Sequence, residues 1–168
     1  MKLPMPPDPA AGYSPDEDRP LAAYSLLTAV FALGFAGSLR LAYRHRGQLP
    51  DGYGVLDVLA IGIATHKLSR LITKDKVTAF ARAPFTRFQD TAGHGELEEE
   101  PRGDGLRRAV GELLVCPYCV EQWVVAGFVV GLVGAPRFTR LIAVMFTAHT
   151  IADFLQLAYK AAEESGPG

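Results

Sequence analysis

A run of nineteen residues without a charged side chain, from Leu21 to Leu39, constrains this chain more than any other feature. The hydrocarbon core of a bilayer is about 30 Å thick, and about 20 residues of apolar helix cross it. A secretory signal peptide has a basic start, whereas here the acidic run at residues 16–18 precedes the block and Arg40 follows it. The sequence therefore predicts a retained N-terminal transmembrane helix over residues 21–43.

The chain before this helix has a different composition. Residues 1–20 contain six prolines and the acidic run at 16–18. Such a segment buries too little apolar surface to offset the entropy lost on ordering. We expect a disordered acidic, proline-rich tail.

A second helix is predicted over residues 55–72. Its first half is apolar apart from Asp57, and Lys67 and Arg70 lie near its end. Long cationic side chains can extend along an apolar surface and place their charges at the membrane interface. We interpret the three charges as marks of the two membrane interfaces, on a helix that need not span the bilayer fully.

The next segment, residues 73–115, is polar and mixed in the sign of its charges, and we expect an extramembrane loop. Glycines and acids in the 93–105 region are typical of a mobile tip. Residues 106–114 return to a pattern compatible with a helix that leads to the two cysteines.

A helical hairpin is predicted over residues 117–160. Residues 123–133 are uninterrupted apolar, Gly134-Ala135-Pro136 breaks the pattern, and residues 141–159 supply a second apolar stretch. We expect two antiparallel membrane helices, followed by a C-terminal tail over residues 161–168.

Together these segments predict an all-α fold: a multi-pass helical membrane protein with three to four transmembrane helices and one long polar loop. Gly127 and Gly131 form a pair of small residues that permits close helix contact. The formal net charge of −1 gives no basic field that would attract nucleic acid.

The orientation follows from the basic residues. Four spans would place the N-terminal tail, the polar loop and the C-terminus on one side, with nine lysines and arginines near the membrane against five on the other side. Because basic residues accumulate on the cytoplasmic side, we expect the polar loop in the cytoplasm. Arg40, Arg44 and Arg46, directly after the first span, favour the opposite orientation.

The two cysteines carry the strongest chemical signal. Cys116-Pro117-Tyr118-Cys119 is the string of the glutaredoxin active site, where a thiolate at a helix start attacks a disulfide and a second thiol resolves the mixed species. The flanking residues do not supply the strand and βαβ frame of that fold. Unpaired N–H groups at a helix start would still stabilise a Cys116 thiolate, while Glu112 nearby opposes it. Redox work, metal binding and a packing role all remain open.

A zinc site needs four donors, and Cys116 and Cys119 would provide two of them. The chain offers four imidazoles, and none belongs to a second pair at ligand spacing: His45, His66, His94 and His149. The zinc signal is incomplete, and no cofactor is predicted.

A polar pair lies on the last predicted helix. His149 and Asp153 are four residues apart and share a helix face, so the carboxylate can accept a hydrogen bond from the imidazole. An ionisable pair inside a membrane span is a functional candidate. The alternative is that the pair satisfies itself, or neutralises Lys67 or Arg70 on a neighbouring helix and so fixes the helix order.

Three strings occur together in a recognisable order. They are residues 62–78 (GIATHKLSRLITKDKVT), residues 82–85 (RAPF) and residues 111–119 (GELLVCPYC), with Trp123 four residues later. In this combination the chain resembles the bacterial membrane-protein family known as domain of unknown function 1360, which includes some sporulation-associated members. The resemblance covers about residues 55–160.

The resemblance implies a helical membrane protein and no biochemical activity. Nine residues stand at the family's motif positions: Arg70, Asp75, Arg82, Pro84, Phe85, Glu112, Cys116, Cys119 and Trp123. Their charges suggest the hypothesis that Arg70, Asp75 and Arg82 form a belt at one membrane face against Glu112, with the thiol pair beside it. If Arg82 pairs with Glu112, a matched charge reversal at Arg82 should rescue a reversal at Glu112.

These observations favour a structural or accessory protein of the cell membrane. Its partners would be the lipid bilayer and other membrane proteins or further copies of itself, with no nucleic acid. No glycine-rich phosphate loop, Ser/His/Asp order or paired carboxylates stand out, which argues against an enzyme. The alternatives are thiol–disulfide exchange and metal binding, both through Cys116 and Cys119.

Overall fold

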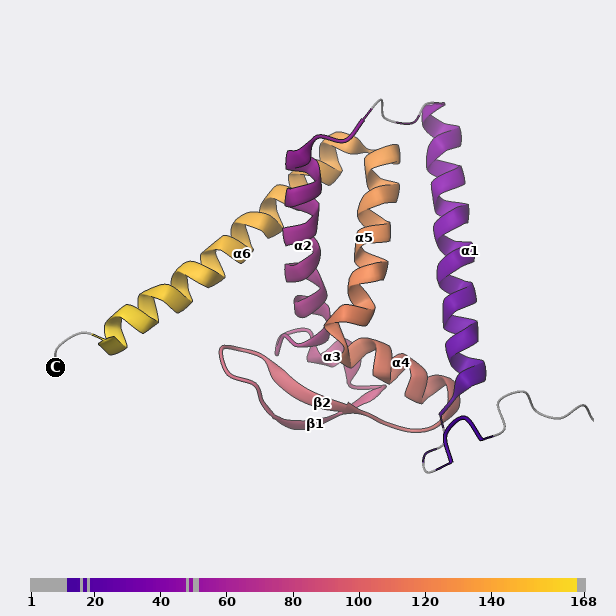
Figure 1. Ribbon diagram of the computed structural model, residues 1–168, viewed down its shortest axis with the longest axis vertical. Coiled ribbons are helices and arrows are strands. Elements are labelled where there is room, and N and C mark those ends of the chain that lie inside the picture. Colours follow the sequence, from indigo (N-terminus) through magenta and orange to yellow (C-terminus); the bar gives the residue numbers. More distant parts are fainter. Residues whose placement is uncertain (1–11, 16, 18, 48, 50–51, 166–168) are drawn as a thin grey trace, which may run out of the picture.

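The computed structural model describes residues 12–15, 17, 19–47, 49 and 52–165. Most of the predicted N-terminal tail lies outside the described residues. The described part forms six helices and one two-stranded sheet (Figure 1). In chain order these are α1 (Leu21–Arg46), α2 (Val55–Thr73), α3 (Ala79–Arg82), β1 (Thr86–Thr91), β2 (Leu97–Pro101), α4 (Gly105–Val115), α5 (Pro117–Gly134) and α6 (Pro136–Ser165).

The fold class predicted from the sequence is confirmed. Within the described residues, α1, α5 and α6 are long and apolar enough to cross a membrane. Helix α1 ends at Gly47, whose positive φ of 71° lets its N–H bond back to the carbonyl of Tyr43. Helix α5 begins at Pro117, a residue that suits the first turn because its missing N–H would have no helical partner there.

The long helices alternate in direction (Figure 1). Helices α1, α2 and α5 run side by side, and α6 starts beside the end of α5 and then diverges from the others. Helices α3 and α4 and the two strands gather at one end, which we call the capped end; together they form the cap. The opposite end, where α1 stops and α6 starts, is the open end.

The core lies where α2, α5 and α6 meet. Ile61 and Ala64 of α2 pack against Phe128 and Leu132 of α5 and Ala143 of α6. The two alanines are fully buried or nearly so, which lets the helix backbones approach closely. Helix α1 packs against α5, with an edge-to-face contact between the rings of Phe31 and Trp123, whose centroids are 5.0 Å apart.

Small and hydroxyl side chains set the spacing of α6. A Cβ added at Gly131 would lie 2.6 Å from Thr139 Oγ1, so only glycine allows this approach of α5 to α6. An added Cβ at Gly127 would meet nothing within 4 Å, so the close contact predicted for both glycines occurs at one of them. Thr147 and Thr150 donate hydrogen bonds to α2 carbonyls, at 2.8 and 3.4 Å.

Helix α2 lies between α5 and α6, and is about 28 Å long at 1.5 Å per residue. Each of its three charges has a partner elsewhere in the chain. Asp57 accepts two hydrogen bonds from Arg140 of α6 at the open end, at 2.8 and 2.9 Å. Lys67 and Arg70 are paired toward the capped end. This helix therefore contributes its charges to contacts within the protein.

The segment predicted as a polar loop, residues 73–115, is folded. Strands β1 and β2 form an antiparallel hairpin with an irregularity between Phe88 and Asp90, and helix α4 packs on it. The predicted mobile tip at 93–105 contains the whole of β2. Helix α6 continues to Ser165, into the predicted tail, because Lys160 and Glu164 extend the helical pattern with an i,i+4 pair.

Candidate functional site at the capped end

The acidic strand β2 is matched to basic residues around it. Glu98 receives a hydrogen bond from Lys74 at 2.8 Å, and Glu100 lies 3.3 Å from Arg87. Glu96, one residue before the strand, takes both guanidinium hydrogen bonds of Arg70. The remaining acid of the strand, Glu99, points inward and pairs with Arg82. The acids in and just before strand β2 therefore form ion pairs with basic residues at the end of α2, in α3 and in β1.

Arg82 is the centre of this arrangement, since its side chain is 1% exposed and that of Glu99 is 5% exposed. Its Nε donates to Glu99 at 2.5 Å, and its two terminal nitrogens donate to two backbone carbonyls and to the Thr78 hydroxyl at 2.7–3.0 Å. Glu99 also accepts a hydrogen bond from Thr86 at 2.8 Å. A buried charge is stable only with such partners. The pair therefore locks α3, β1 and β2 together.

The hairpin tip is attached to the chain just after α2. The backbone N–H of Lys76 donates to Gly95 at 2.9 Å, and that of Leu97 donates to Lys74 at 2.8 Å. Asp75 does not join the charged belt through its carboxylate, which instead accepts the N–H of Val77 at 2.8 Å and shapes the turn. Arg70 and Arg82 lie together at the capped end, where their partners are Glu96 and Glu99 and not Glu112. The backbone carbonyl of Asp75 accepts a hydrogen bond from Arg82.

The predicted pair of Arg82 and Glu112 is wrong. Glu112 lies on α4, where it receives hydrogen bonds from Arg108 at 3.0 Å and from the hydroxyl of Tyr24 on α1. Arg108 also pairs with Glu17, and the hydrogen bond from this guanidinium lowers the pKa of the Glu17 carboxyl. Glu112 therefore connects the cap to α1.

Close backbone packing joins α4 to the hairpin. A Cβ added at Gly111 would lie 2.5 Å from the carbonyl oxygen of Phe85 and 3.1 Å from the Pro101 side chain. Arg107 fixes the same contact by donating two hydrogen bonds to the carbonyl of Pro84, at 2.8 and 2.7 Å. Two of the motif strings, at 82–85 and 111–119, therefore meet at this contact.

The cysteine pair lies at the junction of α4 and α5. Cys116 has an extended backbone and caps α5, and its sulfur forms a disulfide with that of Cys119, with the two Cα atoms 5.2 Å apart. The backbone N–H of Cys119 points at Cys116 Sγ at 3.2 Å. Cys119 and Tyr118 are exposed. The structure thus has a local disulfide at an accessible helix start.

A metal site would need further donors beside these sulfurs. Among the described residues, no group of three or more His, Cys, Asp or Glu side chains is arranged to hold an ion. Two sulfurs that are bonded to each other also offer no thiolate.

The polar cluster on α6 contains a third residue. Asp153 accepts a hydrogen bond from Lys67 of α2 at 2.6 Å, and His149 Nε2 lies 3.9 Å from its other carboxylate oxygen. Asp153 thus neutralises Lys67 on the neighbouring helix, as one of the sequence alternatives has it. The cluster joins α2 to α6 on the side of the capped end.

The sequence does not reveal two features of the site. One is the pairing of the acids of β2 with basic residues, and the other is the contact of Tyr24 with Glu112. A signal for the hairpin is present: Thr86, Phe88 and Thr91 of β1 have high strand propensity, Ala92-Gly93-His94-Gly95 can turn, and Leu97 and Glu99 alternate with outward acids. The contact of Tyr24 has no such local signal, since its partner is 88 residues away.

The fold and this site define a class: a multi-pass helical membrane protein whose longest interhelical segment folds into a charge-paired cap. The chain belongs to the family described as Protein of unknown function (DUF1360), whose model matches residues 60–159. The family resemblance noted from the sequence is therefore confirmed. The matched region contains α5, the whole cap and most of α2 and α6.

Two Bacillus subtilis (strain 168) proteins are similar to this chain. Sporulation protein YjcA is 32% identical over 78 residues, which cover 45% of this chain and 65% of that protein. UPF0713 protein YngL is 29% identical over 90 residues, covering 52% of this chain and 65% of that protein. The chain thus spans just under two thirds of the length of each relative. No solved structure matches it.

Proposed function

We propose that this protein is an accessory component of the cell membrane that works by binding other membrane proteins through α6. The observation that carries the proposal is the divergence of α6 from the bundle (Figure 1). The buried residues of α6 are Thr139, Ala143 and Thr150, all in its first half. Large apolar side chains are exposed in both halves, but the second half has no buried residue; its exposed apolar side chains are Ile151, Phe154, Leu155, Leu157 and Tyr159.

A helix that is held at one end and free along the other is suited to pack against a helix from another chain. The hydrogen bonds of Thr147 and Thr150 fix the first half against α2, and the Lys67–Asp153 pair holds the helix just past its middle; the residues beyond Asp153 are free. The free half has aromatic and branched side chains that give van der Waals contact, which drives helix association in lipid.

Site-specific photo-crosslinking in cells tests this function. A photoreactive residue at Leu155 should give a discrete crosslinked protein, either another chain or a second copy. The matched control is Leu33 on α1, which is also strongly exposed. If both positions give only lipid adducts, or the same diffuse protein products, the proposal is wrong.

We further propose that the capped end faces the cytoplasm. The support is the excess of basic residues on the side of the N-terminus, the cap and the C-terminus. A green fluorescent protein fused after Gly168 should fluoresce, and an alkaline phosphatase fused there should be inactive. Active phosphatase at that position would reverse the orientation.

Thiol–disulfide exchange is the second candidate function, favoured by the accessible disulfide at the start of α5. In the reduced form, the Cys116 thiolate would attack a disulfide of a partner protein and form a mixed disulfide. Cys119 would then release the partner as a dithiol, and the pair would be left as the observed disulfide. Two electrons pass from the cysteine pair to the partner. The N–H of Cys119, which lies 3.2 Å from Cys116 Sγ in the disulfide form, would stabilise the thiolate in the reduced form.

Maleimide labelling in intact and permeabilised cells tests this candidate, because the chain has two cysteines. Labelling that requires a reductant would show the disulfide in the cell, and Cys119→Ser should then label at Cys116 without reductant. Labelling of the unaltered protein without reductant would show free thiols. The accessory role would then be the remaining candidate function. A chelator that exposes both thiols would point to the metal alternative.

A further inference from the structure

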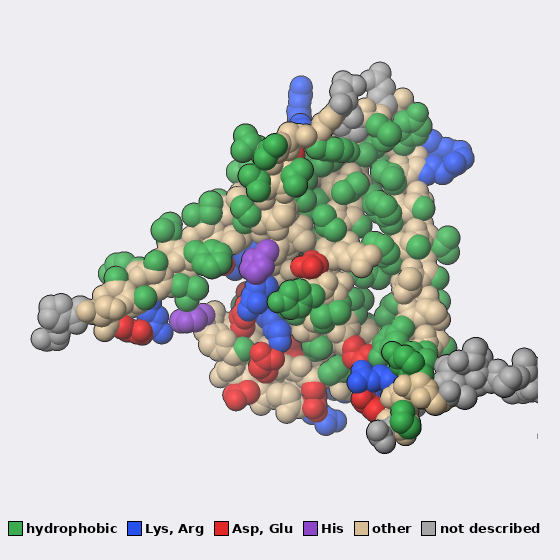
Figure 2. Space-filling model, viewed as in Figure 1, with side chains coloured by type: hydrophobic (Ala, Val, Ile, Leu, Met, Phe, Trp, Pro, Cys, Tyr) green, Lys and Arg blue, Asp and Glu red, His purple; other side chains and the backbone are tan. Residues whose placement is uncertain are grey.

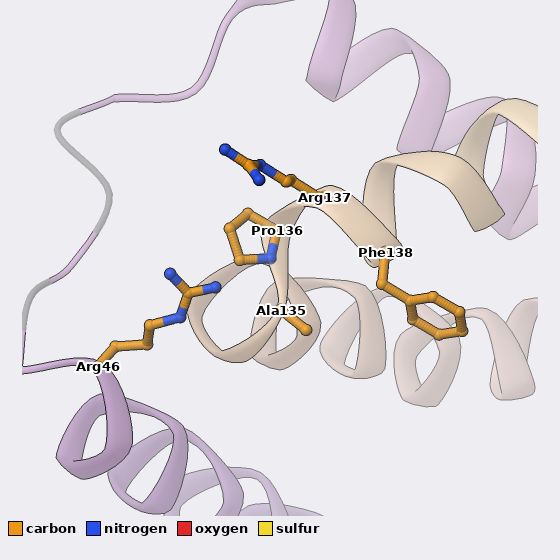
Figure 3. Close-up of a pocket in the computed structure, with 5 residues that line it drawn as sticks. All are labelled: Arg46, Ala135, Pro136, Arg137 and Phe138. Atoms are coloured by element: carbon orange, nitrogen blue, oxygen red, sulfur yellow. The ribbon is translucent and has the colours of Figure 1, made fainter.

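A pocket lies at the open end, far from the cap. It is lined by Arg46, Ala135, Pro136, Arg137 and Phe138 and has a volume of about 450 Å³. This volume is within the range of about 300–1,000 Å³ that is common for small-molecule sites. The pocket is formed where the end of α1 meets the turn between α5 and α6. In Figure 3 the Pro136 ring lies between the guanidinium groups of Arg46 and Arg137, and the Phe138 ring points away from both.

Arg46 is held in place beside this pocket. Its Nε donates a hydrogen bond to the carbonyl oxygen of Gly134, at 3.0 Å, at the end of α5. This bond uses one of the five guanidinium donors and leaves the two terminal nitrogens for a ligand. A positioned arginine loses less conformational entropy when a ligand binds than a mobile one does.

Among the described residues, the charge around the pocket is positive. Basic side chains stand out at the open end in Figure 2, whereas acidic and basic side chains are mixed at the capped end. Among the described residues at the open end, the acid Asp57 is paired with Arg140. Within that same part of the chain, Arg137 makes no ion pair or side-chain hydrogen bond, and Arg46 has no acidic partner. An anion would therefore find two guanidinium groups whose charges the described residues do not neutralise.

We propose that this pocket binds the phosphate-bearing headgroup of an anionic membrane lipid. Arginine guanidinium groups bind phosphate oxygens with paired, charge-assisted hydrogen bonds. The pocket lies at the ends of helices that are long and apolar enough to cross the membrane, which is the depth of the headgroups. Ala135, Pro136 and Phe138 provide an apolar wall for the glycerol and the first acyl carbons. A zwitterionic lipid is disfavoured, because its own cation would lie beside the two arginines.

Native mass spectrometry of the purified full chain in detergent tests the proposal. Phosphatidylglycerol should bind more tightly than phosphatidylcholine with the same acyl chains. Arg46→Gln with Arg137→Gln should weaken phosphatidylglycerol binding by roughly 100-fold, at about tenfold for each arginine whose charge-assisted hydrogen bond to the phosphate is lost. The matched control is Arg40→Gln with Arg44→Gln, which removes the same charge from α1 outside the pocket and should change binding little.

The single substitution Arg137→Gln distinguishes a loss of lipid binding from a loss of folding. Because Arg137 has no partner among the described residues, this variant should keep the melting temperature of the unaltered protein and still lose about tenfold in lipid affinity. Equal weakening in the pocket variant and the control would mean diffuse surface attraction and would overturn the proposal. Displacement of phosphatidylglycerol by millimolar inorganic phosphate would also overturn it, in favour of a site for free phosphate.

Discussion

At the scale of single residues, the cap depends on one charge that has no access to water. Arg82 is 1% exposed and donates every described hydrogen bond inward, to Glu99, Thr78 and two backbone carbonyls. A pair of this kind contributes little net stability compared with apolar residues of equal volume, but removing one partner leaves a buried charge without compensation. The pair therefore favours the arrangement of the cap in which Arg82 and Glu99 meet.

The substitution Glu99→Gln should therefore destabilise the protein by about 3–5 kcal/mol, the range for a broken buried pair. Thermal or urea unfolding in detergent micelles measures the change. Glu98→Gln is the matched control, since the Glu98 side chain is 53% exposed and its bond to Lys74 should be worth about 0–1 kcal/mol. Equal losses in the two variants would contradict the central role of Arg82.

A pH effect is expected at Glu17. The hydrogen bond from Arg108 lowers the pKa of this carboxyl below its ordinary value of 4.5. The contact should thus be fully present above pH 4.5 and should be lost as the pH falls through the lowered pKa, while Arg108 stays charged. Limited proteolysis near residue 19 should become faster on that acid side. Glu17→Gln should remove the pH dependence, and an unchanged profile in that variant would exclude this contact as its cause.

At the scale of elements, the contact of α4 with the hairpin requires a missing side chain. Gly111→Ala would place a methyl group 2.5 Å from the carbonyl oxygen of Phe85, and backbone cannot move aside as a flexible side chain can. We expect a loss of about 1–3 kcal/mol from overpacking, despite a gain of roughly 1 kcal/mol in helix propensity.

Gly127→Ala is the comparison for this substitution, because an added Cβ there meets nothing within 4 Å. The melting temperature should stay the same or rise in Gly127→Ala and should fall in Gly111→Ala. A fall of equal size in both variants would mean that general helix effects, and not the contact with Phe85, determine the result.

The long helices were predictable, and the cap was not. Uncharged runs such as Leu21–Leu39 specify membrane helices by length and composition, which are local properties. The hairpin was overlooked because the glycines at 93 and 95 and the acids at 98–100 are also typical of a loop. The sequence identifies Arg70, Arg82 and the cysteines as candidate site residues. The acids that bind the two arginines are not identified, because Glu96 lies 26 residues from Arg70 and Glu99 lies 17 residues from Arg82. Pairing over such separations is decided by tertiary structure.

At the scale of the whole molecule, ion pairs link α2 to its neighbours at several depths. Asp57 with Arg140 is at the open end, and Lys67 with Asp153 is closer to the cap. Both pairs join α2 to α6, so they fix where α6 leaves the bundle. The charges that make α2 a poor membrane span by composition are the charges that hold the helices in register.

Lys67→Met should accordingly destabilise the protein, because Asp153 loses its partner. The loss should be smaller than the roughly 3–5 kcal/mol of a fully buried pair, since the Asp153 side chain is 40% exposed. The double variant Lys67→Met with Asp153→Leu should recover most of it. Thermal unfolding of the three proteins measures the coupling, and a double variant that is worse than the single one would contradict it.

The divergence of α6 also affects the surrounding bilayer. The three upright helices and the diverging α6 give the molecule a triangular outline, narrow at the open end and wide at the cap (Figure 1). A body of this outline takes up more area in one leaflet than in the other. In a bilayer crossed by these helices, lipid packing around the molecule would be uneven between the two leaflets.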